Sequence, residues 1–331
     1  MAVSPPILVI LGPTASGKSA LALDLAQRMG AHILSVDSMQ VYRGMDIGTA
    51  KPTLAERAQV PHHLIDLVDP NEVFAVARFV DLADEVIRDC GQRDIPLIVT
   101  GGTPLYYKSL FEGLFDGPPA DECLRAELRQ VPNEELARRL VTIDPEAGAR
   151  IHVNDTKRLI RAIEVHELTG KPISSFQTDW AGGTFRHNAM WIGLDWDREL
   201  INRRVNARVK AMLAAGWLEE TRELLRNFGS LSPTAAEATG YRDLIDHLEG
   251  RVSLEDAAEQ IKIATRQLAR RQMKWFRRWK QVQWIAGDRP PEELARYVAG
   301  HWKPMENDEG RNSNVESNPK DELQMTKRRQ D

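Results

Sequence analysis

The sequence predicts an α/β fold: a P-loop core built on a doubly wound parallel sheet, interrupted by an all-helical insertion. Three observations predict it. A glycine-rich octapeptide, residues 12–19, follows the apolar run Ile7–Leu11 and precedes a stretch with helical apolar spacing. Short apolar strands then alternate with amphipathic helices to about residue 115, which is typical of a parallel sheet. Between residues 121 and 169 the chain consists of helix-forming residues with helical apolar spacing and no convincing strand.

The octapeptide has the pattern of a phosphate-binding loop, with Gly12 and Gly17 followed by Lys18 and Ser19. In such a loop the backbone N–H groups surround a phosphate at the positive end of the next helix. The lysine reaches the outer phosphate, and the Ser19 hydroxyl can bind Mg²⁺. The alternative is a strand-to-helix turn without a ligand. The loop does not identify its phosphate, because ATP and a diphosphate on any organic group present the same oxygens.

The predicted strand over residues 31–36 ends at Asp37, and a polar, glycine-bearing loop follows over residues 37–52. In open α/β sheets the carboxyl ends of the strands border the ligand crevice, so we expect this loop beside the phosphate site. Three interpretations of Asp37 stay open at this point. The carboxylate can help to hold Mg²⁺, act as a general base or cap a turn.

Further strands are expected over residues 62–67 and 95–99, with an amphipathic helix between them. The second strand leads through Gly101 and Gly102 to Thr103, which precedes Pro104. This pattern predicts a helix whose N-cap is Thr103 and whose first residue is Pro104, and the cap explains Thr103 without any ligand.

A boundary is expected near residue 116, where the strand–helix alternation stops. A strand returns at residues 190–194, followed by helices around 201–213 and 217–225 and one long helix over 253–280. The last residues are charged and almost free of large apolar side chains, which predicts a disordered tail. The expected division is a first core part (1–115), a helical insertion (116–189), a second core part with a basic helix (190–303) and the tail (304–331).

The composition is that of a soluble globular protein, with 42% hydrophobic and 28% charged residues in 331. The longest aliphatic run is five residues and the N-terminus lacks a basic signal segment, so we expect a cytoplasmic protein with no membrane partner. Cys90 and Cys123 lie far apart without a metal motif. His62 and His63 are adjacent and point apart in a strand. We therefore expect neither a disulfide nor a zinc site.

Residues 260–287 contain no Asp or Glu, although the formal net charge of the chain is −4. Within them Lys262, Arg266, Arg270 and Lys274 stand four residues apart and form one cationic stripe on a helix. Near its end lie Trp275, Phe276 and Trp279. Such a stripe can follow a phosphate backbone while the rings stack on bases. The alternative is a solvated helix face with an aromatic packing side, and the absence of acidic residues favours nucleic acid.

At this stage the sequence resembles the tRNA dimethylallyltransferase family, also called tRNA isopentenyltransferases, in its bacterial form. The resemblance covers nearly all of residues 6–285. It is carried by the motifs at residues 12–19, 37–42, 44–52, 61–66, 101–106, 154–158, 240–242 and 265–272.

The resemblance implies an activity. A dimethylallyl group is transferred from dimethylallyl diphosphate to N6 of adenosine 37 in tRNAs that read codons beginning with U. It implies Mg²⁺ as cofactor and the tRNA anticodon stem-loop as partner. Separately, we expect a monomer. The exocyclic amine must lose a proton as it attacks, so a nearby carboxylate is useful. Charge builds on the leaving diphosphate, so cations and N–H donors lower the barrier.

The resemblance also assigns roles to residues. Asp37 is implied as the base, with Lys18 and Thr103 as further catalytic residues and Ser19 as the metal ligand. The implied diphosphate site is the whole loop: Gly12, Pro13, Thr14, Ala15, Ser16, Gly17, Lys18 and Ser19. The implied tRNA contacts are Asp37, Ser38, Met39, Gln40, Thr103, Arg125, Lys157, Arg158, Leu159, Ile160, Arg161, Gly240, Tyr241, Arg242, Arg266, Arg270, Arg271, Gln272, Lys274, Trp275 and Arg277.

Two other functions fit parts of the sequence. A P-loop small-molecule kinase would use Asp37 to activate a hydroxyl or hold the metal, but it gives no role to the cationic stripe. An RNA-binding module with a degenerate loop would not need the intact pair of Lys18 and Ser19.

Overall fold

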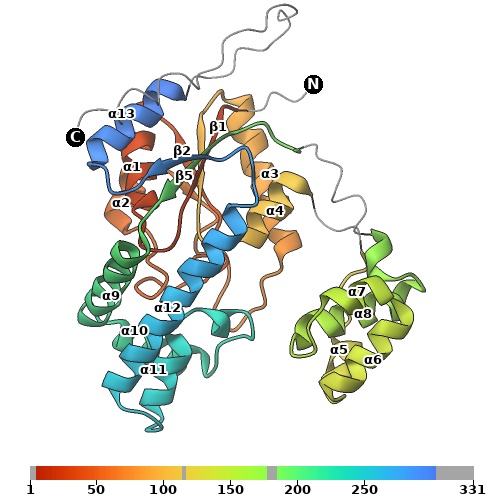
Figure 1. Cartoon of the computed structure of the whole chain (residues 1–331). Coiled ribbons are helices and arrows are strands. Elements are labelled where there is room, and N and C mark those ends of the chain that lie inside the picture. The colour runs from red at the N-terminus through yellow and green to blue at the C-terminus, as the bar shows by residue number, and fades with distance from the viewer. Residues whose placement is uncertain (1–4, 114–116, 177–184, 303–331) are drawn as a thin grey trace, which may run out of the picture.

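The computed structural model describes residues 5–113, 117–176 and 185–302. Its centre is a six-stranded, all-parallel sheet with the strand order β3-β2-β4-β1-β5-β6 (Figure 1). This confirms the predicted α/β class. The strands are β1 (Ile7–Leu11), β2 (His32–Ser35), β3 (His62–His63), β4 (Leu97–Thr100), β5 (Met190–Asp195) and β6 (Gln283–Ala286).

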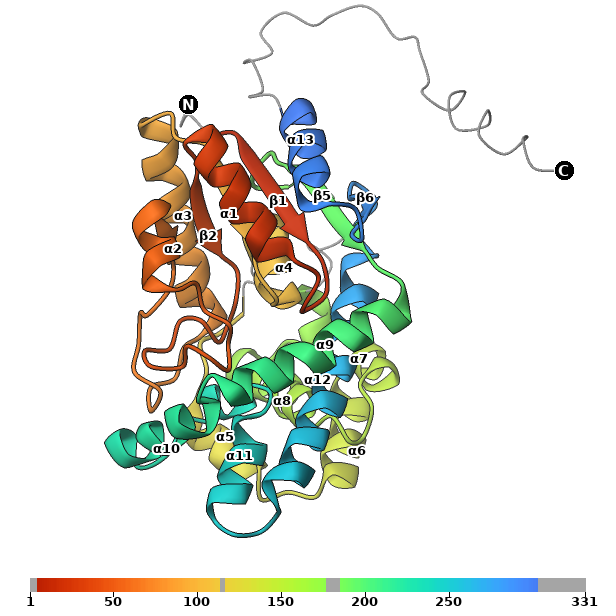
Figure 2. The same ribbon diagram turned by 90° about the vertical axis from the view of Figure 1, so that its left-hand side faces the viewer.

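The central strand β1 is aliphatic at every position because it is buried on both faces of the sheet. Leu8 and Ile10 pack on one face with α1 (Lys18–Met29) and α13 (Pro291–His301). Val9 and Leu11 belong to the other face, which α3 (Val76–Gln92) and α4 (Pro104–Glu112) cover. Figure 2 shows α1 and α13 side by side on their face of the sheet. The sheet is therefore doubly wound, as predicted.

A separate group of helices follows α4 in the chain and carries its own apolar core (Figure 1). Leu136, Leu140, Leu159 and Ile163 are completely buried in it. Residues 117–176 and 185–189, the described part of the predicted insertion, contain no strand. The helices are α5 (Glu122–Leu128), α6 (Asn133–Ile143), α7 (Pro145–Arg150) and α8 (Thr156–Thr169).

Another helical group lies below the carboxyl end of the sheet in Figures 1 and 2. It contains α9 (Arg198–Ala214), α10 (Trp217–Phe228), α11 (Tyr241–Leu248) and α12 (Leu254–Phe276). The long predicted helix therefore ends four residues earlier than expected. β6 and α13, which follow it, were not predicted, and neither was the short helix α2 (Leu54–Gln59).

The strand predicted over residues 62–67 is also shorter than expected. Leu64 and Asp66 have left-handed backbones with φ of 62° and 57°, which a β-strand cannot contain, so β3 ends at His63. No helix among the described residues is long and apolar enough to cross a membrane. The predicted tail, residues 304–331, lies outside the described residues.

Candidate active site

The phosphate-binding loop connects β1 to α1 and is held from its outer side by residues of β5–α9. The Arg204 side chain donates a hydrogen bond to the Ala15 carbonyl (2.8 Å), and the Trp196 indole donates to the Ser16 carbonyl (3.1 Å). A side chain at position 12 would bring a Cβ within 2.7 Å of the Ser16 hydroxyl oxygen, so Gly12 is required by close packing. Gly17, with φ of 91°, is the N-cap of α1.

A cavity of about 520 Å³ opens beside this loop, at the carboxyl ends of β1, β2 and β4. Its position agrees with the crevice expected from the sequence. The cavity brings together Thr14, Lys18, Ser19, Asp37, Ser38, Met39, Gln40, Thr103, Arg208 and Gln272.

Asp37 is a half-buried carboxylate that the fold partly shields from water. The backbone N–H of Met39 donates to its Oδ1 atom at 2.9 Å. Burial raises the pKa of Asp37 above its ordinary value, although this hydrogen bond and the charges of Lys18 and Arg208 act against the rise. A carboxylate with a raised pKa is a stronger base than an aspartate in water, so the environment suits proton abstraction.

Gly101 and Gly102 make the space that Asp37 occupies. A Cβ at position 101 would lie 2.0 Å from the Val36 carbonyl oxygen, and one at position 102 would lie 3.0 Å from Asp37 Oδ2. A side chain at position 101 would therefore push the ends of β2 and β4 apart, and one at position 102 would displace the side chains of Asp37 and Gln272.

Lys18 is buried in the loop, and its ammonium group contacts the Pro13 carbonyl at 3.4 Å. Burial and the nearby Arg208 lower the pKa of Lys18 to about 8, while Asp37 acts in the opposite direction. The pKa of Arg208 is also lowered by burial, which Asp37 opposes. Two cations thus share one enclosed site with a single aspartate beside them, an arrangement that favours binding of an anion.

Arg208 was not among the predicted site residues. It lies on α9, one helical turn after Arg204, whose side chain holds the loop. This four-residue spacing was the available signal, because it places both arginines on the same helix face.

Thr103 lies at the N-cap of α4 with Pro104 as the first helical residue, as predicted, but its side chain makes no capping hydrogen bond. Its hydroxyl instead accepts from the Ser38 backbone N–H at 2.9 Å and donates to the Ser38 hydroxyl at 3.1 Å. The cap therefore does not account for the Thr103 side chain, whose hydrogen bonds go to Ser38. Thr103 joins the start of α4 to the residue directly after Asp37.

Gln272 reaches from α12 into the phosphate-binding loop. Its side-chain oxygen accepts a hydrogen bond from the Thr14 backbone N–H at 2.8 Å, and its amide nitrogen donates to the Gly102 carbonyl at 2.7 Å. The side chain is only 3% exposed. The basic helix is thus tied directly to both walls of the cavity.

The loop over residues 37–52 is held by buried polar side chains. Gln40 accepts from the Ser35 hydroxyl at 2.8 Å and donates to the carbonyls of Thr49 and Ala50. The ammonium group of Lys51, which is fully buried, contacts Asp46 and Asp66 at 2.5 and 2.7 Å. Several motif residues behind the family resemblance therefore shape the cavity wall.

Glu220 on α10 anchors the same loop from the opposite side. Its carboxylate accepts hydrogen bonds from the backbone N–H groups of Asp46, Ile47 and Gly48, and a further bond of 2.6 Å from the Tyr241 hydroxyl. Tyr241 is completely buried, so its side chain supports this anchor and does not face a ligand. The adjacent Gly240 is left-handed and packs against Trp217. The tRNA contact implied for Tyr241 stays a prediction.

On α12 the predicted cations divide into exposed and engaged groups. Arg270, Arg271, Lys274 and Arg277 are exposed. Arg266 is half-buried and donates to Asn206 at 2.6 Å, while Lys262 pairs with Glu259 at 2.5 Å. Arg277 is also paired, because it donates to Asp195 at 2.9 Å, so the exposed cationic surface consists of Arg270, Arg271 and Lys274.

The aromatic residues near the end of α12 do not form a stacking platform. Phe276 and Trp279 are buried, and both rings pack against Tyr107. The interpretation as an aromatic packing side is thus correct for these two rings. Trp275 is half-buried, with the Arg278 guanidinium 4.8 Å from its ring centre.

In the insertion, the side chains of Leu159 and Ile160 are buried in the apolar core, and the tRNA contacts implied for these residues stay predictions. Arg125 binds Glu164 through two hydrogen bonds of 2.8 and 3.0 Å, and Arg161 binds the same carboxylate at 2.6 Å. Among the other predicted contacts, Lys157 pairs with Glu237, Arg158 pairs with Asp155, and Arg242 is exposed.

The site can accommodate Mg²⁺ only together with a ligand. The Ser19 hydroxyl and the Asp37 carboxylate line the cavity, and both are oxygen donors of the type that Mg²⁺ prefers. Two such groups do not make a complete cage. Oxygens of a bound diphosphate would supply further ligands, as in other phosphate sites.

Fold and site together define the class: an α/β P-loop protein in which a half-buried carboxylate lies beside the phosphate-binding loop. The sequence profile described as IPP transferase matches residues 40–279, and the profile described as Isopentenyl transferase matches residues 5–66. The chain belongs to the IPP transferase family. This confirms the resemblance found in the motifs.

Individual relatives agree with this assignment. The chain is 46% identical over 283 residues to the tRNA dimethylallyltransferase of Geobacter metallireducens, covering 84% of this chain and 92% of that protein. The crystal structure of the tRNA isopentenylpyrophosphate transferase of Bacillus halodurans superposes with a TM-score of 0.66 at 37% identity, covering 90% and 96%. A eukaryotic dimethylallyltransferase acting on tRNA matches with a TM-score of 0.76 at 28% identity, covering 90% and 77%.

Proposed function

We propose that this enzyme transfers the dimethylallyl group of dimethylallyl diphosphate to N6 of adenosine 37 in tRNAs that read codons beginning with U. The observation that carries the proposal is the meeting of Asp37, Lys18 and Arg208 at one cavity beside the phosphate-binding loop. Family membership and the names of the relatives support the substrates.

The donor's diphosphate is held by the loop. Its N–H groups, Lys18 and Arg208 surround the phosphate oxygens, where negative charge grows as the allylic C–O bond breaks. The electron pair of that bond remains on the departing diphosphate. Ser19 would be the protein ligand of Mg²⁺, which would supply positive charge beside the leaving diphosphate.

The acceptor adenine enters from the opposite side of the cavity, where Asp37 lies. As N6 bonds to the allylic carbon, its proton passes to the Asp37 carboxylate. Thr103 positions this base, because its hydroxyl holds Ser38 directly after Asp37. Met39 and Gln40 line the same part of the cavity and provide packing for the adenine ring.

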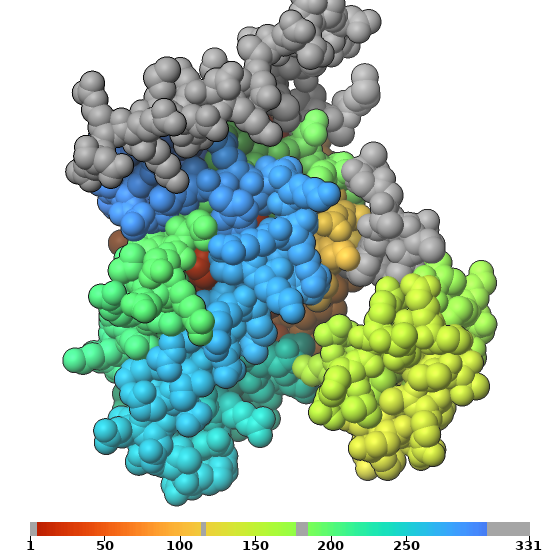
Figure 3. Space-filling model, viewed as in Figure 1, coloured from red at the N-terminus to blue at the C-terminus, as the bar shows by residue number. Residues whose placement is uncertain are grey.

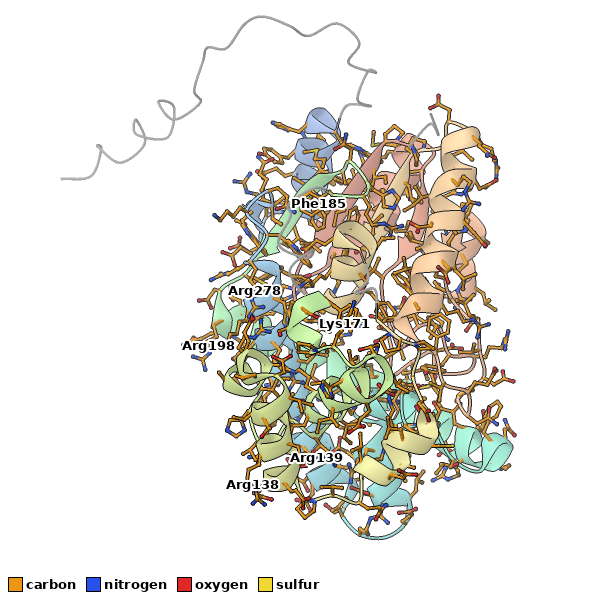
Figure 4. The ribbon with its side chains drawn as sticks, turned by 90° about the vertical axis from the view of Figure 1, so that its right-hand side faces the viewer. Arg138, Arg139, Lys171, Phe185, Arg198 and Arg278 are labelled. Atoms are coloured by element: carbon orange, nitrogen blue, oxygen red, sulfur yellow. The ribbon has the colours of Figure 1, made fainter. Side chains whose placement is uncertain are left out.

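An anticodon-loop adenine must leave its stack to enter a cavity, at a cost of a few kcal/mol. Cations on the protein surface would offset this cost by binding the tRNA backbone. Figure 3 shows α12 on the surface, with open space between it and the insertion. In Figure 4, Arg138, Arg139 and Lys171 of the insertion and Arg278 of the core are visible from one side. These four residues extend the cationic set found from the sequence.

The remaining proposals concern the setting of the reaction. The enzyme acts as a monomer in the cytoplasm, where its tRNA substrate is found, and requires Mg²⁺. The single cavity contains both the loop and Asp37, so a second copy is not needed to complete the chemistry.

The experiment offers bulk tRNA lacking the modification together with labelled dimethylallyl diphosphate or labelled ATP. Label from the first donor should reach adenosine 37, and its N6 attachment is checked by mass spectrometry of the nucleosides. Transfer of phosphate from ATP to a small molecule, without prenylation, would instead identify a kinase. tRNA binding without any transfer would identify an RNA-binding module.

A further inference from the structure

We propose that His32, His63 and Cys90 form a binding site for a soft divalent metal ion, with Zn²⁺ as the best match. One ligand atom of each residue lies within 4.8 Å of the other two. His32 Nδ1 and His63 Nε2 are 2.9 Å apart, and Cys90 Sγ is 3.9 Å from His32 Nδ1. Among the described residues this is the one cluster with at least three such ligands.

The fold explains why these three residues meet although they are distant in the sequence. His32 begins β2 and His63 ends β3, and the two strands are parallel neighbours with Leu34 opposite His63. Alternation places His32 and His63 on the same sheet face. Cys90 on α3 is completely buried against this face, while both histidines are half-buried and leave a path from solvent.

The distances suit a tetrahedral ion after a small adjustment. Zn–N bonds of about 2.0–2.1 Å and a Zn–S bond of about 2.3 Å put ligand atoms roughly 3.3–3.6 Å apart. The observed separations of 2.9 and 3.9 Å lie on either side of this value. Without metal, the two rings share a hydrogen bond. With metal, both nitrogens and the sulfur bind the ion, and the Cys90 proton leaves to solvent.

The donor set separates this site from the catalytic cavity. Imidazole and thiolate select Zn²⁺ or Cu(I), while Mg²⁺ prefers oxygen ligands. His32 lies at the amino end of β2, about 10 Å along the strand from its carboxyl end. Three protein ligands leave a fourth position for water.

A metal here would join the two-residue edge strand β3 to β2 and α3. The chain after β3 continues to Asp66, which holds Lys51 below the loop of residues 37–52. The ion would therefore stabilise the fold and, at a distance, the wall of the cavity.

The test titrates the chelator-treated full-length protein with Co²⁺ and follows the thiolate-to-cobalt charge-transfer band in the near ultraviolet. We expect one equivalent to bind. Cys90→Ser should abolish the band, and His63→Gln should weaken binding at least tenfold. Two matched controls should bind as the parent does: Cys123→Ser, which changes the exposed cysteine, and His62→Gln, whose side chain is directed to the other sheet face and contacts the Val60 carbonyl.

Zn²⁺ provides a second readout, a rise in Tm of the parent and of both controls that His63→Gln lacks. This readout decides the question if Cys90→Ser does not fold. The proposal is overturned if the parent shows no cobalt band, if the band survives in Cys90→Ser, or if Cys123→Ser removes it. In those cases the cluster is a hydrogen-bonded histidine pair beside a core cysteine.

Discussion

At the scale of single residues, the site depends on two groups with shifted pKa values, the buried Lys18 and the half-buried Asp37. Burial raises the pKa of Asp37, and burial together with Arg208 lowers that of Lys18 to about 8. The two shifts move the groups toward the same pH range. A base and an anion-binding cation can thus be adjusted in one cavity without a histidine.

Replacing Asp37 by Asn tests its role as a base. The amide keeps the shape and the hydrogen bonds but cannot accept the N6 proton, so single-turnover transfer should fall by about 10²–10⁴-fold while both substrates bind nearly as before. The measurement is repeated over a range of Mg²⁺ concentrations, with the exposed Asp24→Asn as control. A large recovery at high Mg²⁺ would mean that Asp37 mainly holds the metal.

The pH dependence of the reaction follows from the same two shifts. Activity should be lost as pH falls through the raised pKa of Asp37, because the protonated carboxyl is not a base. It should also be lost as pH rises through about 8, because neutral Lys18 holds the diphosphate less well. We expect a bell-shaped profile of kcat/KM for the donor.

Lys18→Arg separates the two limbs of that profile, because arginine stays charged well above this range. The affinity for inorganic diphosphate, measured by calorimetry across the alkaline limb, should fall with pH in the parent enzyme and stay nearly constant in the variant. An unchanged alkaline fall in the variant would assign this limb to another group.

At this scale the sequence predicted the residues that belong to local motifs. Lys18, Ser19 and Asp37 follow strands directly, so their neighbours in the chain indicate their place. Gln272 was predicted only from the motif at residues 265–272, and Arg208 was not predicted although its spacing from Arg204 indicated a shared helix face. How α9 and α12 pack against the loop is a long-range property that neither pattern contains.

At the scale of elements, the strands that could be predicted are those marked by a local pattern, and the others depend on long-range pairing. β1 is a continuous aliphatic run, whereas β6 has only one buried residue in four. β6 exists because it pairs with β5, where Gly193 leaves room for the Trp284 ring. The cationic stripe on α12 was read correctly from its spacing, but its inner members are engaged with Asn206 and Glu259.

The double variant Arg270→Ala with Lys274→Ala tests the outer face of α12. Both side chains are exposed, so we expect weaker tRNA binding and a salt dependence reduced by about one log unit per lost contact. The exposed Arg28→Ala on α1 is the control. An unchanged slope of log affinity against log salt would show that this face is merely solvated.

At the scale of the whole molecule, the protein has distinct apolar cores. The insertion buries its own cluster, and its charged centre is Glu164, whose side chain is 0% exposed and contacts Arg125, Arg161 and the Asp121 N–H. This network orients two of the arginines predicted to meet tRNA. We therefore expect that the insertion can lose order while the sheet remains folded.

Glu164→Gln should destabilise the insertion by on the order of 3 kcal/mol, because it removes the charge that compensates two arginines in a buried site. Hydrogen exchange should increase in peptides from α8 but not in those from β1. The control, Glu167→Gln, breaks an exposed pair with Arg139 and should change stability little. Equal loss of protection in β1 would show that the cores unfold as one unit.

The contact between Gln272 and Thr14 has a consequence for how the two substrates influence each other. The backbone N–H of Thr14 can donate a full hydrogen bond to one acceptor only. In this structure that acceptor is the side-chain oxygen of Gln272. A phosphate oxygen that accepts this hydrogen bond must turn the Gln272 carboxamide aside, and Gln272 belongs to the helix that presents cations to RNA. We therefore expect binding at the loop and binding along α12 to be thermodynamically coupled, and such coupling is reciprocal. If bound RNA changes the affinity for the donor by some factor, the bound donor changes the affinity for RNA by the same factor.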